Sequence, residues 1–405
     1  MPWKEVSAMS LRAEFVALAE ADGENVRALC RRFGISAPTG YKWLTRFRQE
    51  GQAGLADASR RPRSSPSKTE AALERVVIAL RKRHPAWGAR KLRARLLDQG
   101  HCDLPTPSTI QAILTRAGLI RAADSAKHRA FVRFEHAAPN DLWQMDFKGH
   151  FALTSGDRCH PLTVLDDHSR YALRLAACQN EQHQTVQQQL IDAFRRYGLP
   201  QRMLMDNGSP WSGGRDEPYT VLTVWLLRLG IGVTHGRPYH PQTQGKDERF
   251  HRTLKAEVLQ WEEFATLAAC QRRFDKWRDI YNLERPHEAL AMKTPVSRFR
   301  PSERSYPERL PAIEYGPDDI VRKITVNGDL TFRGHEVSIS KAFRGERLAL
   351  RPTTTDGVWD VYYCQQQLGQ LHVSGQPGAI VSAPTFVRCA HYGRRRNEDT
   401  METTT

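Results

Sequence analysis

The sequence predicts a multidomain protein with an all-α N-terminal region, a central α/β domain and a small all-β barrel near the C-terminal end. Its 405 residues suit two to four domains, and 40% of them are hydrophobic, which is enough for separate cores. The spacing of apolar residues changes twice along the chain. It is helical before about residue 130, mixed between 140 and 300, and typical of strands after about residue 318.

The chain is strongly basic, and the excess charge is concentrated near the N-terminus. The formal net charge is +15 and the pI is about 9.7. Residues 1–135 hold 25 Lys and Arg against 13 Asp and Glu, so most of the excess lies in the first third. Such a surface predicts a polyanionic partner, and we expect the N-terminal part to bind nucleic acid.

The cysteines and the apolar runs exclude several classes of protein. Seven cysteines are scattered without a Cys-x-x-Cys pair, which argues against a disulfide framework and against a cysteine zinc site. No apolar stretch approaches the length of a membrane span, and the N-terminal segment lacks the apolar core of a signal peptide. We therefore expect a soluble, cytoplasmic protein that does not contact membranes.

Residues 1–53 predict a helix-turn-helix domain. Three short helices fit the pattern of 10–50, and the third begins after Gly34 with Ser36 as its N-cap. Helical spacing gives this third helix an apolar face: Tyr41, Leu44 and Phe47. Three other residues lie elsewhere on its surface, where a recognition helix contacts DNA: Thr39, Lys42 and Arg46. A plain three-helix bundle with a solvated basic face would give the same pattern.

A second helical domain is predicted over 69–130, after a basic linker rich in Arg, Ser and Pro at 54–68. Helices are expected near 70–83 and 88–99, and a third begins at Thr106-Pro107, an N-cap followed by proline at the first helical position. The middle helix is strongly basic, with four cationic residues: Arg90, Lys91, Arg93 and Arg95. This pattern favours a second helix-turn-helix, with a packed bundle as the alternative.

The central domain is predicted over 136–305, as a mixed five-stranded sheet with helices packed on it. The strand-like segments are 141–151, 160–167, 171–178, 201–206 and a weaker one near 231–235. The helix-like segments are 181–197, 219–229, 243–259 and a long C-terminal stretch at 262–283. After it, the hairpin signal Asn327-Gly328 and further short strands predict the small barrel at 318–375. We expect the tail 376–405 to be disordered.

Three carboxylates of the central domain stand where they are awkward for folding and useful for chemistry: Asp146, Asp206 and Glu248. The first interrupts a strand-like run, the second ends an apolar run before Asn-Gly, and the third opens a helix. Close carboxylates raise one another's pKa unless a cation lies between them. A pair of Mg²⁺ ions fits, because hard cations bind carboxylate oxygens and clamp the phosphate of a nucleic acid.

The helix that carries Glu248 has two different faces. Arg252 and Lys255 follow it at i+4 and i+7 on the same side. An apolar set lies on roughly the opposite side: Phe250, Leu254 and Val258. An acid that binds a metal, flanked by two cations, suits a phosphodiester backbone. An ordinary Glu–Arg pair on a solvated helix would have the same spacing.

Five segments together resemble a known family: QMDF, LDDHSRY, DNGSPW, GRPYHPQTQGKDERFHRTLK and YNLERPHEAL. They are similar to those of the integrase-type DDE transposases of bacterial insertion sequences, relatives of retroviral integrases, over about 10–300. The resemblance implies a ribonuclease-H-like core whose catalytic and metal-binding triad is Asp146, Asp206 and Glu248. It also implies two Mg²⁺ ions per active site, with Mn²⁺ as a substitute.

The resemblance further implies a set of DNA contacts. The loop from Gly236 to Gly245, with Tyr239, would touch DNA, and Arg252 and Lys255 would hold DNA ends. The two helix-turn-helix domains would read the terminal repeats of the element. Two ends must be cut and joined together, so we expect a homo-oligomer on double-stranded DNA, acting at the nucleoid.

The sequence departs from the family pattern in two respects. Between Asp206 and Glu248 lie 41 residues, several more than is usual, and the polar loop 212–220 is the expected site of the extra length. The His/Cys zinc domain of retroviral integrases is absent, and helix-turn-helix units stand in its place.

Other polar residues near these motifs are not assigned a catalytic role. We expect Asp166 and Asp167 in LDDHSRY to lie in a turn, where Asp167, Ser169 and Arg170 have a structural role; metal ligation is the alternative. Asp216 and Glu217 are expected to be solvated. The histidines 240 and 251 lie near the predicted site without an assigned role.

The expected function is that of a transposase, which cleaves DNA strands at the element ends and transfers them into target DNA. Two other classes remain open on the sequence alone. One is a DNA-binding regulator with an inactive core, which would not nick DNA. The other is a hydrolytic nuclease on a related core, which would not join a 3′-hydroxyl end to a target.

Overall fold

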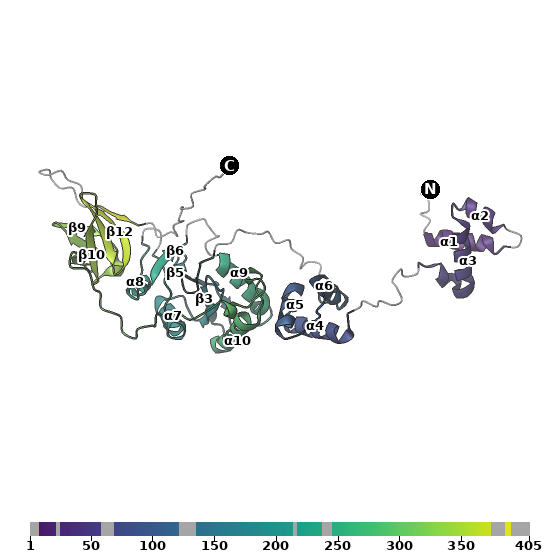
Figure 1. Cartoon of the computed structure of the whole chain (residues 1–405), viewed down its shortest axis with the longest axis horizontal. Coiled ribbons are helices and arrows are strands. Elements are labelled where there is room, and N and C mark those ends of the chain that lie inside the picture. Colours follow the sequence, from purple (N-terminus) through teal and green to yellow (C-terminus); the bar gives the residue numbers. More distant parts are fainter. Residues whose placement is uncertain are drawn as a thin grey trace. The chain divides into compact units, whose positions relative to one another are not determined.

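The computed structural model describes residues 8–21, 25–57, 69–120, 135–213, 217–236, 245–373 and 385–389. The chain forms two compact units, Met1–Thr69 and Glu70–Thr405 (Figure 1). No helix within the described stretches is both long enough and apolar enough to cross a membrane.

The first unit is a three-helix domain. It contains α1 (Ala8–Ala19), α2 (Val26–Arg32) and α3 (Ala37–Glu50), followed by the short 3₁₀ turn η1 (Gly51–Leu55). Ser36 caps α3 by accepting a hydrogen bond from the Thr39 amide, as predicted. Gly40 allows α3 to pack closely, because a Cβ there would overlap Cys30 and Phe15.

Two predictions about this unit are wrong. Tyr41 is 48% exposed, and the buried aromatic residue of α3 is instead Trp43, which packs with Leu44 in the core. The linker does not begin at residue 54, because Leu55 is fully buried. Arg12 also donates to the Leu55 carbonyl at 2.9 Å and pairs with Asp57 at 2.8 Å, so the domain extends to residue 57.

The second unit begins with another three-helix bundle, formed by α4 (Ala71–Arg83), α5 (Ala89–Asp98) and α6 (Pro107–Arg116). Thr106 caps α6 and Pro107 takes its first position, as the sequence predicts. The bundle has its own core, which includes Val77, Trp87, Leu92 and Ile110. The loop between α4 and α5 stacks His84 on Trp87, with ring centroids 3.9 Å apart.

The central domain is built on a mixed sheet of six strands. They are β1 (Trp143–Phe147), β2 (Phe151–Ala152), β3 (Arg158–Asp166), β4 (Ala172–Cys178), β5 (Arg202–Met205) and β6 (Gly232–His235). β1 and β2 both pair antiparallel with β3 and correspond to the single strand predicted at 141–151. β5 then pairs parallel with β1, and β6 parallel with β5. The predicted five-stranded arrangement holds once β1 and β2 are taken together.

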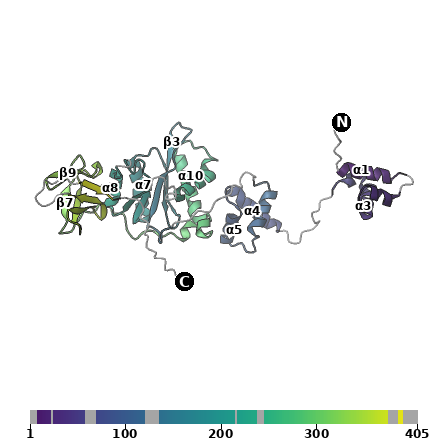
Figure 2. The same cartoon turned by 90° about the horizontal axis from the view of Figure 1, so that it is seen from above.

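Helices cover both faces of this sheet. Alternate residues of β1, such as Trp143 and Met145, pack with α7 (His183–Tyr197) and α8 (Val221–Arg228). On the other face, Leu165 and Leu175 pack with α9 (Gly245–Leu254) and α10 (Leu267–Asp279). Figure 2 shows α7 and α10 on opposite sides of β3.

Both α9 and α10 run on into π-helical turns. These turns are η4 (Lys255–Leu259) and η5 (Ile280–Glu284). Short 3₁₀ turns follow at Glu288–Leu290 and Pro295–Ser297. The apolar face predicted for the Glu248 helix is confirmed, because Phe250, Leu254 and Val258 are all buried against α10 and η5.

The C-terminal domain is all-β, but it is not the predicted closed barrel. A five-stranded antiparallel sheet has the order β13–β12–β11–β10–β7, and β8 pairs only with β9. Within the described residues, β7 and β13 remain unpaired edges. The strands are β7 (Ile320–Lys323), β8 (Asp329–Phe332), β9 (His335–Ser338), β10 (Arg347–Pro352), β11 (Val358–Tyr363), β12 (Gln366–His372) and β13 (Thr385–Arg388). Because β13 pairs with β12, the prediction of a wholly disordered tail is wrong at 385–388.

The extra loop of the core contacts this C-terminal domain. Tyr219 packs edge-on against Phe343 in the 3₁₀ turn η8 (Lys341–Phe343), with ring centroids 5.0 Å apart. Ser340 donates to the Glu217 carboxylate at 2.9 Å, so Glu217 is not simply solvated as predicted; Asp216 lies outside the described residues. Glu217 and Tyr219, in the loop where the extra length is expected, therefore contribute to the contact between the core and the β domain, next to α8 (Figure 1).

Candidate active site

Asp146 lies near the end of β1, in a crowded acidic environment. Its side chain is 23% exposed, and its backbone carbonyl accepts a hydrogen bond from the Thr163 hydroxyl at 2.9 Å. Burial, with smaller effects of the charges of Asp206, Glu181 and Glu248, raises the pKa of Asp146 to about 7. Asp206 and Glu248 thus lie near enough to Asp146 for their charges to raise its pKa, as does Glu181.

Asp206 is the first residue after β5, and β5 is the strand that pairs with β1. Its carboxylate accepts a hydrogen bond from the Gly208 amide at 2.9 Å. A side chain at position 208 would stand 3.3 Å from both carboxylate oxygens, so glycine keeps the space around them open. The Asp206 carbonyl lies 2.9 Å from Nδ1 of His235, which ties this strand end to β6.

Glu248 lies in the first turn of α9, which packs against β1. Its side chain is exposed, in contrast to Asp247 beside it. Among the described residues, no three His, Cys, Asp or Glu side chains are close enough, as they stand, to hold a metal ion.

His251 is a site residue to which sequence reasoning gave no role. It follows Glu248 by one helical turn and is 8% exposed, with Nδ1 3.9 Å from Asp146 Oδ2. Its Nε2 lies 2.9 Å from the Thr163 hydroxyl, which already donates to Asp146 O and therefore accepts from Nε2–H. Burial, with a smaller effect of Lys148, lowers the pKa of His251 to about 4. A neutral imidazole thus faces Asp146. In the sequence, the spacing of three residues after Glu248 is the signal that could have placed His251 at the site.

Asp247 is a second residue near the site that sequence reasoning did not single out. It is fully buried, and among the residues that the structure describes neither of its carboxylate oxygens has a hydrogen-bond partner. Burial raises its pKa well above the ordinary value, and the nearby charges of Asp146 and Asp167 add to this effect. Sequence alone could not separate Asp247 from Glu248, because the two acids are adjacent and only the packing of α9 decides which one is buried.

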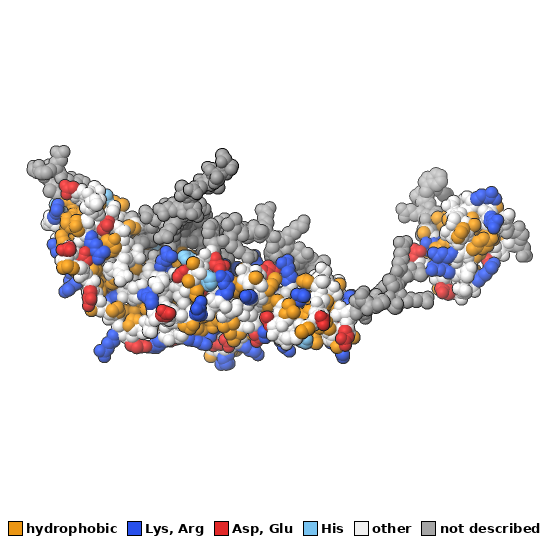
Figure 3. Space-filling model, in the orientation of Figure 1, with side chains coloured by type: hydrophobic (Ala, Val, Ile, Leu, Met, Phe, Trp, Pro, Cys, Tyr) orange, Lys and Arg blue, Asp and Glu red, His pale blue; other side chains and the backbone are white. Residues whose placement is uncertain are grey.

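The predicted DNA-binding residues of the first unit surround one indole ring. Arg12, Lys42 and Arg46 lie over Trp43, at 3.9, 5.1 and 5.3 Å from its centroid. Lys42 is exposed and Arg46 half-buried, while the Thr39 hydroxyl contacts that of Ser36 at 2.9 Å. Lys and Arg side chains are visible at the surface of this unit in Figure 3.

Predicted contacts on α5 have protein partners, although the Arg90 side chain remains 71% exposed. Arg90 lies 3.9 Å from Glu288, and Arg93 donates to the Pro105 carbonyl at 3.1 Å. Burial, with a smaller effect of the charge of Arg285, lowers the pKa of Lys91 to about 8. Arg95 forms an ion pair with Glu284 at 2.7 Å.

The remaining predicted contacts lie before α9, on it, or in η4 directly after it. Arg252 and Lys255 are exposed, and Lys255 lines a cavity of about 380 Å³ together with Lys148 and His150. Tyr239 and His240 lie outside the described residues, as does most of the loop from Gly236 to Gly245.

Known protein families match almost every part of this architecture. Residues 136–241 and 229–295 match models described as an integrase core domain, and together they span Asp146, Asp206 and Glu248. Residues 319–376 match the C-terminal domain of IS481 family transposases. At the other end, 11–63 match a helix-turn-helix domain and 39–114 a homeodomain-like domain.

Insertion elements encode similar proteins. An uncharacterized 31.7 kDa protein of element IS407 from Burkholderia multivorans is 26% identical over 60% of this chain and 85% of its own length. An uncharacterized 39.2 kDa protein of element IS476 from Xanthomonas euvesicatoria is 27% identical over 62% and 71%. Among solved structures, the HTLV-2 integrase catalytic core domain in complex with magnesium covers 40% of this chain and 97% of its own, at 15% identity and a TM-score of 0.31. The chain therefore contains regions that match integrase core and helix-turn-helix domains and a C-terminal region that matches that of IS481 family transposases, and it is similar to proteins of insertion elements.

Proposed function

We propose that this protein is a transposase that cleaves and joins DNA strands through Asp146, Asp206 and Glu248, with two Mg²⁺ ions held by these carboxylates. The observation that carries the proposal is the crowding around Asp146, whose pKa is raised to about 7 by burial and by the charges of Asp206, Glu181 and Glu248. Such an arrangement is unfavourable for the protein alone and becomes favourable once cations lie among the carboxylates.

The residues present fit a hard divalent cation. All three side chains offer only carboxylate oxygens, which suit Mg²⁺, and Mn²⁺ would accept the same ligands. Gly208 leaves the Asp206 oxygens accessible. When bound, the ions would polarise the scissile phosphate and lower the pKa of an attacking water. Glu248 is exposed, so its side chain would turn toward Asp146 to complete the site.

The protein groups would act by holding the reacting DNA. In the first step, water attacks the phosphorus at the element end and a 3′-hydroxyl is released. In the second step, this hydroxyl attacks a phosphodiester of the target, and the target 3′-oxygen leaves. Arg252 and Lys255 lie on the Glu248 side of α9, where they would contact the phosphates that flank the scissile bond. No serine or tyrosine nucleophile is required.

The other DNA contacts would lie on the helical domains. Lys42 and Arg46 of α3 would contact the terminal repeat, together with Thr39. Two element ends need two active sites, so we propose a homo-oligomer assembled on paired ends. The ion pairs of Arg90 and Arg95 with Glu288 and Glu284 compete with any DNA contact of α5.

The test is a strand-cleavage assay with the purified protein and labelled DNA carrying its own element ends. With Mg²⁺, the wild type should release the 3′ end and join it to a target, and Asp206→Asn should lower both rates by at least ~10³-fold. End binding, measured by fluorescence anisotropy in Ca²⁺, should stay within about threefold. An Asp206→Asn protein that still joins strands would remove Asp206 from the catalytic triad.

The assay also separates the two alternative classes. A DNA-binding regulator would bind the ends tightly without nicking them, and a hydrolytic nuclease would cut without producing joined molecules.

A further inference from the structure

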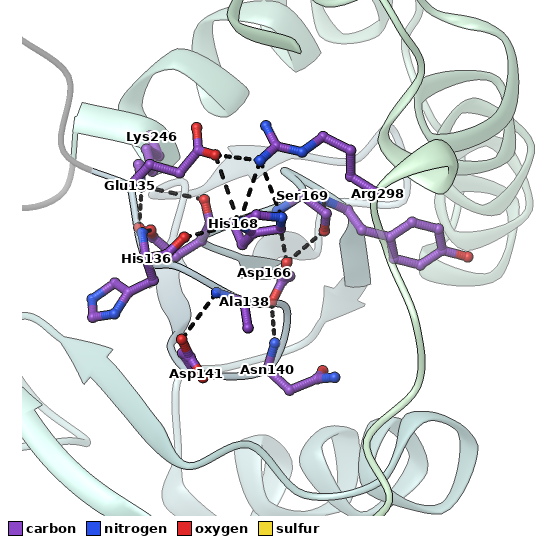
Figure 4. A network of polar contacts seen from close by, with 12 residues as sticks. Glu135, His136, Ala138, Asn140, Asp141, Asp166, His168, Ser169, Lys246 and Arg298 are labelled. Atoms are coloured by element: carbon purple, nitrogen blue, oxygen red, sulfur yellow. Dashed lines mark hydrogen bonds and ion pairs between the residues drawn. The ribbon is translucent and has the colours of Figure 1, made fainter.

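Asp167 is a buried carboxylate that joins three separate parts of the core. It lies in the turn between β3 and β4 and is 3% exposed. It accepts hydrogen bonds from the His136 amide at 2.9 Å and from Gln144 Nε2 at 2.6 Å, and it forms an ion pair with Lys246. Lys246 also donates to the Asp167 carbonyl at 3.2 Å. Figure 4 shows Lys246 and His136 beside the turn that carries Asp166, His168 and Ser169.

Each of the two side-chain partners of Asp167 precedes a residue of the proposed triad by two positions in the sequence. Gln144 precedes Asp146 by two residues on β1, so the two side chains share one face of the strand. Lys246 precedes Glu248 by two residues on α9, so the two side chains point in nearly opposite directions. Holding Lys246 inward therefore turns Glu248 outward, away from the packed side of the helix.

We propose that Asp167 is a positioning residue, which sets the register between β1 and α9 and thereby the placement of Asp146 against Glu248. The inference rests on the proposed triad, because a register between these elements matters for catalysis only if both carboxylates act. Asp167 does not touch DNA or metal in this proposal; it acts through Gln144 and Lys246.

The rest of α9 does not replace this contact. Phe250, Leu254 and Val258 fix the axis of the helix against α10, but they lie beyond its first turn. His251 holds the next turn through Thr163. The first turn carries the buried Asp247, which has no hydrogen-bond partner within the described residues, and the Lys246–Asp167 pair is a polar attachment of this turn to the core. Removing one member would leave the other buried without its counter-charge, and the turn would shift.

Asp166, the neighbouring residue, provides a matched control. It is also buried, but it is held by neutral donors: the Asn140 amide at 2.7 Å, and the Ser169 amide and hydroxyl at 2.8 and 2.5 Å. These groups lie in the turn and in the segment before β1, and none of them is on α9. Asp166→Asn removes a buried charge from the same turn without releasing Lys246.

The experiment compares Asp167→Asn, Lys246→Met and Asp166→Asn in the full-length protein. Hydrogen–deuterium exchange should speed up in peptides covering 245–254 for the first two variants, and stay unchanged there for Asp166→Asn. Mn²⁺ binding, followed by electron paramagnetic resonance without DNA, should weaken about tenfold in the first two. At saturating DNA the joining rate should fall about 100-fold, since a displacement near 1 Å has that effect, with the Kd for the element end unchanged.

Rescue and non-additivity distinguish positioning from general destabilisation. Lys246→Arg should restore most of the joining rate, and the double variant Asp167→Asn/Lys246→Met should be no slower than either single variant. Unchanged exchange at 245–254 and unchanged Mn²⁺ binding in Asp167→Asn would overturn the proposal, as would equal effects from Asp166→Asn. If the wild type fails to join strands, the proposed function fails, and the exchange and Mn²⁺ data still decide this inference.

Discussion

At the scale of single residues, Asp146 links catalysis to stability. Its pKa in the folded protein, about 7, is well above the ordinary value of 3.8. An acid with a raised pKa destabilises the fold once the pH exceeds its unfolded value, and the loss is complete above the folded value. The metal-free protein is therefore less stable at pH 8 than it would be with a neutral group at this position.

Asp146→Asn should accordingly raise the free energy of unfolding of the metal-free protein at pH 8, by about 2–4 kcal/mol. The gain should decrease between pH 7 and 4 and vanish below pH 4, where Asp146 is protonated in both states. Urea denaturation at pH 8 and pH 4, with EDTA present, measures both values. Added Mg²⁺ should stabilise the wild type and have little effect on the variant. A gain that is equal at both pH values would show that the ionisation of buried Asp146 is not its cause.

The sequence predicts some of the site residues and not others, for a physical reason. Asp146 and Asp206 interrupt or end apolar runs, so their positions are visible without a structure. Asp247 and Glu181 became apparent only in the fold, because their effect depends on burial and on distances across the sheet. His251 shows the same limit, since its role follows from the Thr163 and Asp146 contacts on another element.

At the scale of elements, α3 concentrates cations around one aromatic ring. Lys42 and Arg46 of the helix and Arg12 of α1 all lie over Trp43, which holds three positive charges on one side of the unit. Such a group of charges suits a phosphate backbone, and its contribution to DNA binding should depend strongly on salt.

Lys42→Ala should weaken binding of the element end about tenfold at ~0.1 M salt, and reduce the slope of log K against log salt by about 1. Arg48→Ala is the matched control, because Arg48 lies on the same helix but pairs with Glu20 at 2.8 Å. Its effect should stay within about twofold. Anisotropy titrations at several salt concentrations measure both quantities, and equal losses from the two variants would contradict a role for the Trp43 cluster.

Elements were predicted well where the signal is local. The caps at Ser36 and Thr106 and the apolar face of α9 follow from short sequence patterns, and the structure contains all three. The choice between Tyr41 and Trp43 as the buried aromatic of α3 depends on how α1 and η1 pack on the helix. Barrel closure depends on pairing between the first and last strands of the domain, which no local pattern encodes.

At the scale of the whole molecule, the chain divides into two units with separate cores. Within the second, a single apolar cluster runs from Trp143 of the sheet through Tyr219 to Phe343 and Leu350 of the C-terminal domain. Two domains that share a core in this way should unfold together.

Phe343→Ala should therefore destabilise the catalytic core as well as the β domain, by about 3–5 kcal/mol. In scanning calorimetry, the substitution should lower one transition that covers the catalytic core and the β domain together, and leave transitions of the first unit and of the α4–α6 bundle, which have their own cores, unchanged. A transition of the catalytic core that Phe343→Ala does not move would contradict the shared core.

The loop around Tyr219 also limits how parts of this protein can be exchanged with relatives. Shortening the loop would expose Phe343 and remove the carboxylate that accepts the hydrogen bond of Ser340. A β domain grafted onto a core without the loop would lose the same two contacts. A functional chimera should keep residues 212–220 and 318–373 from one parent. The two segments form a single module although about 100 residues separate them.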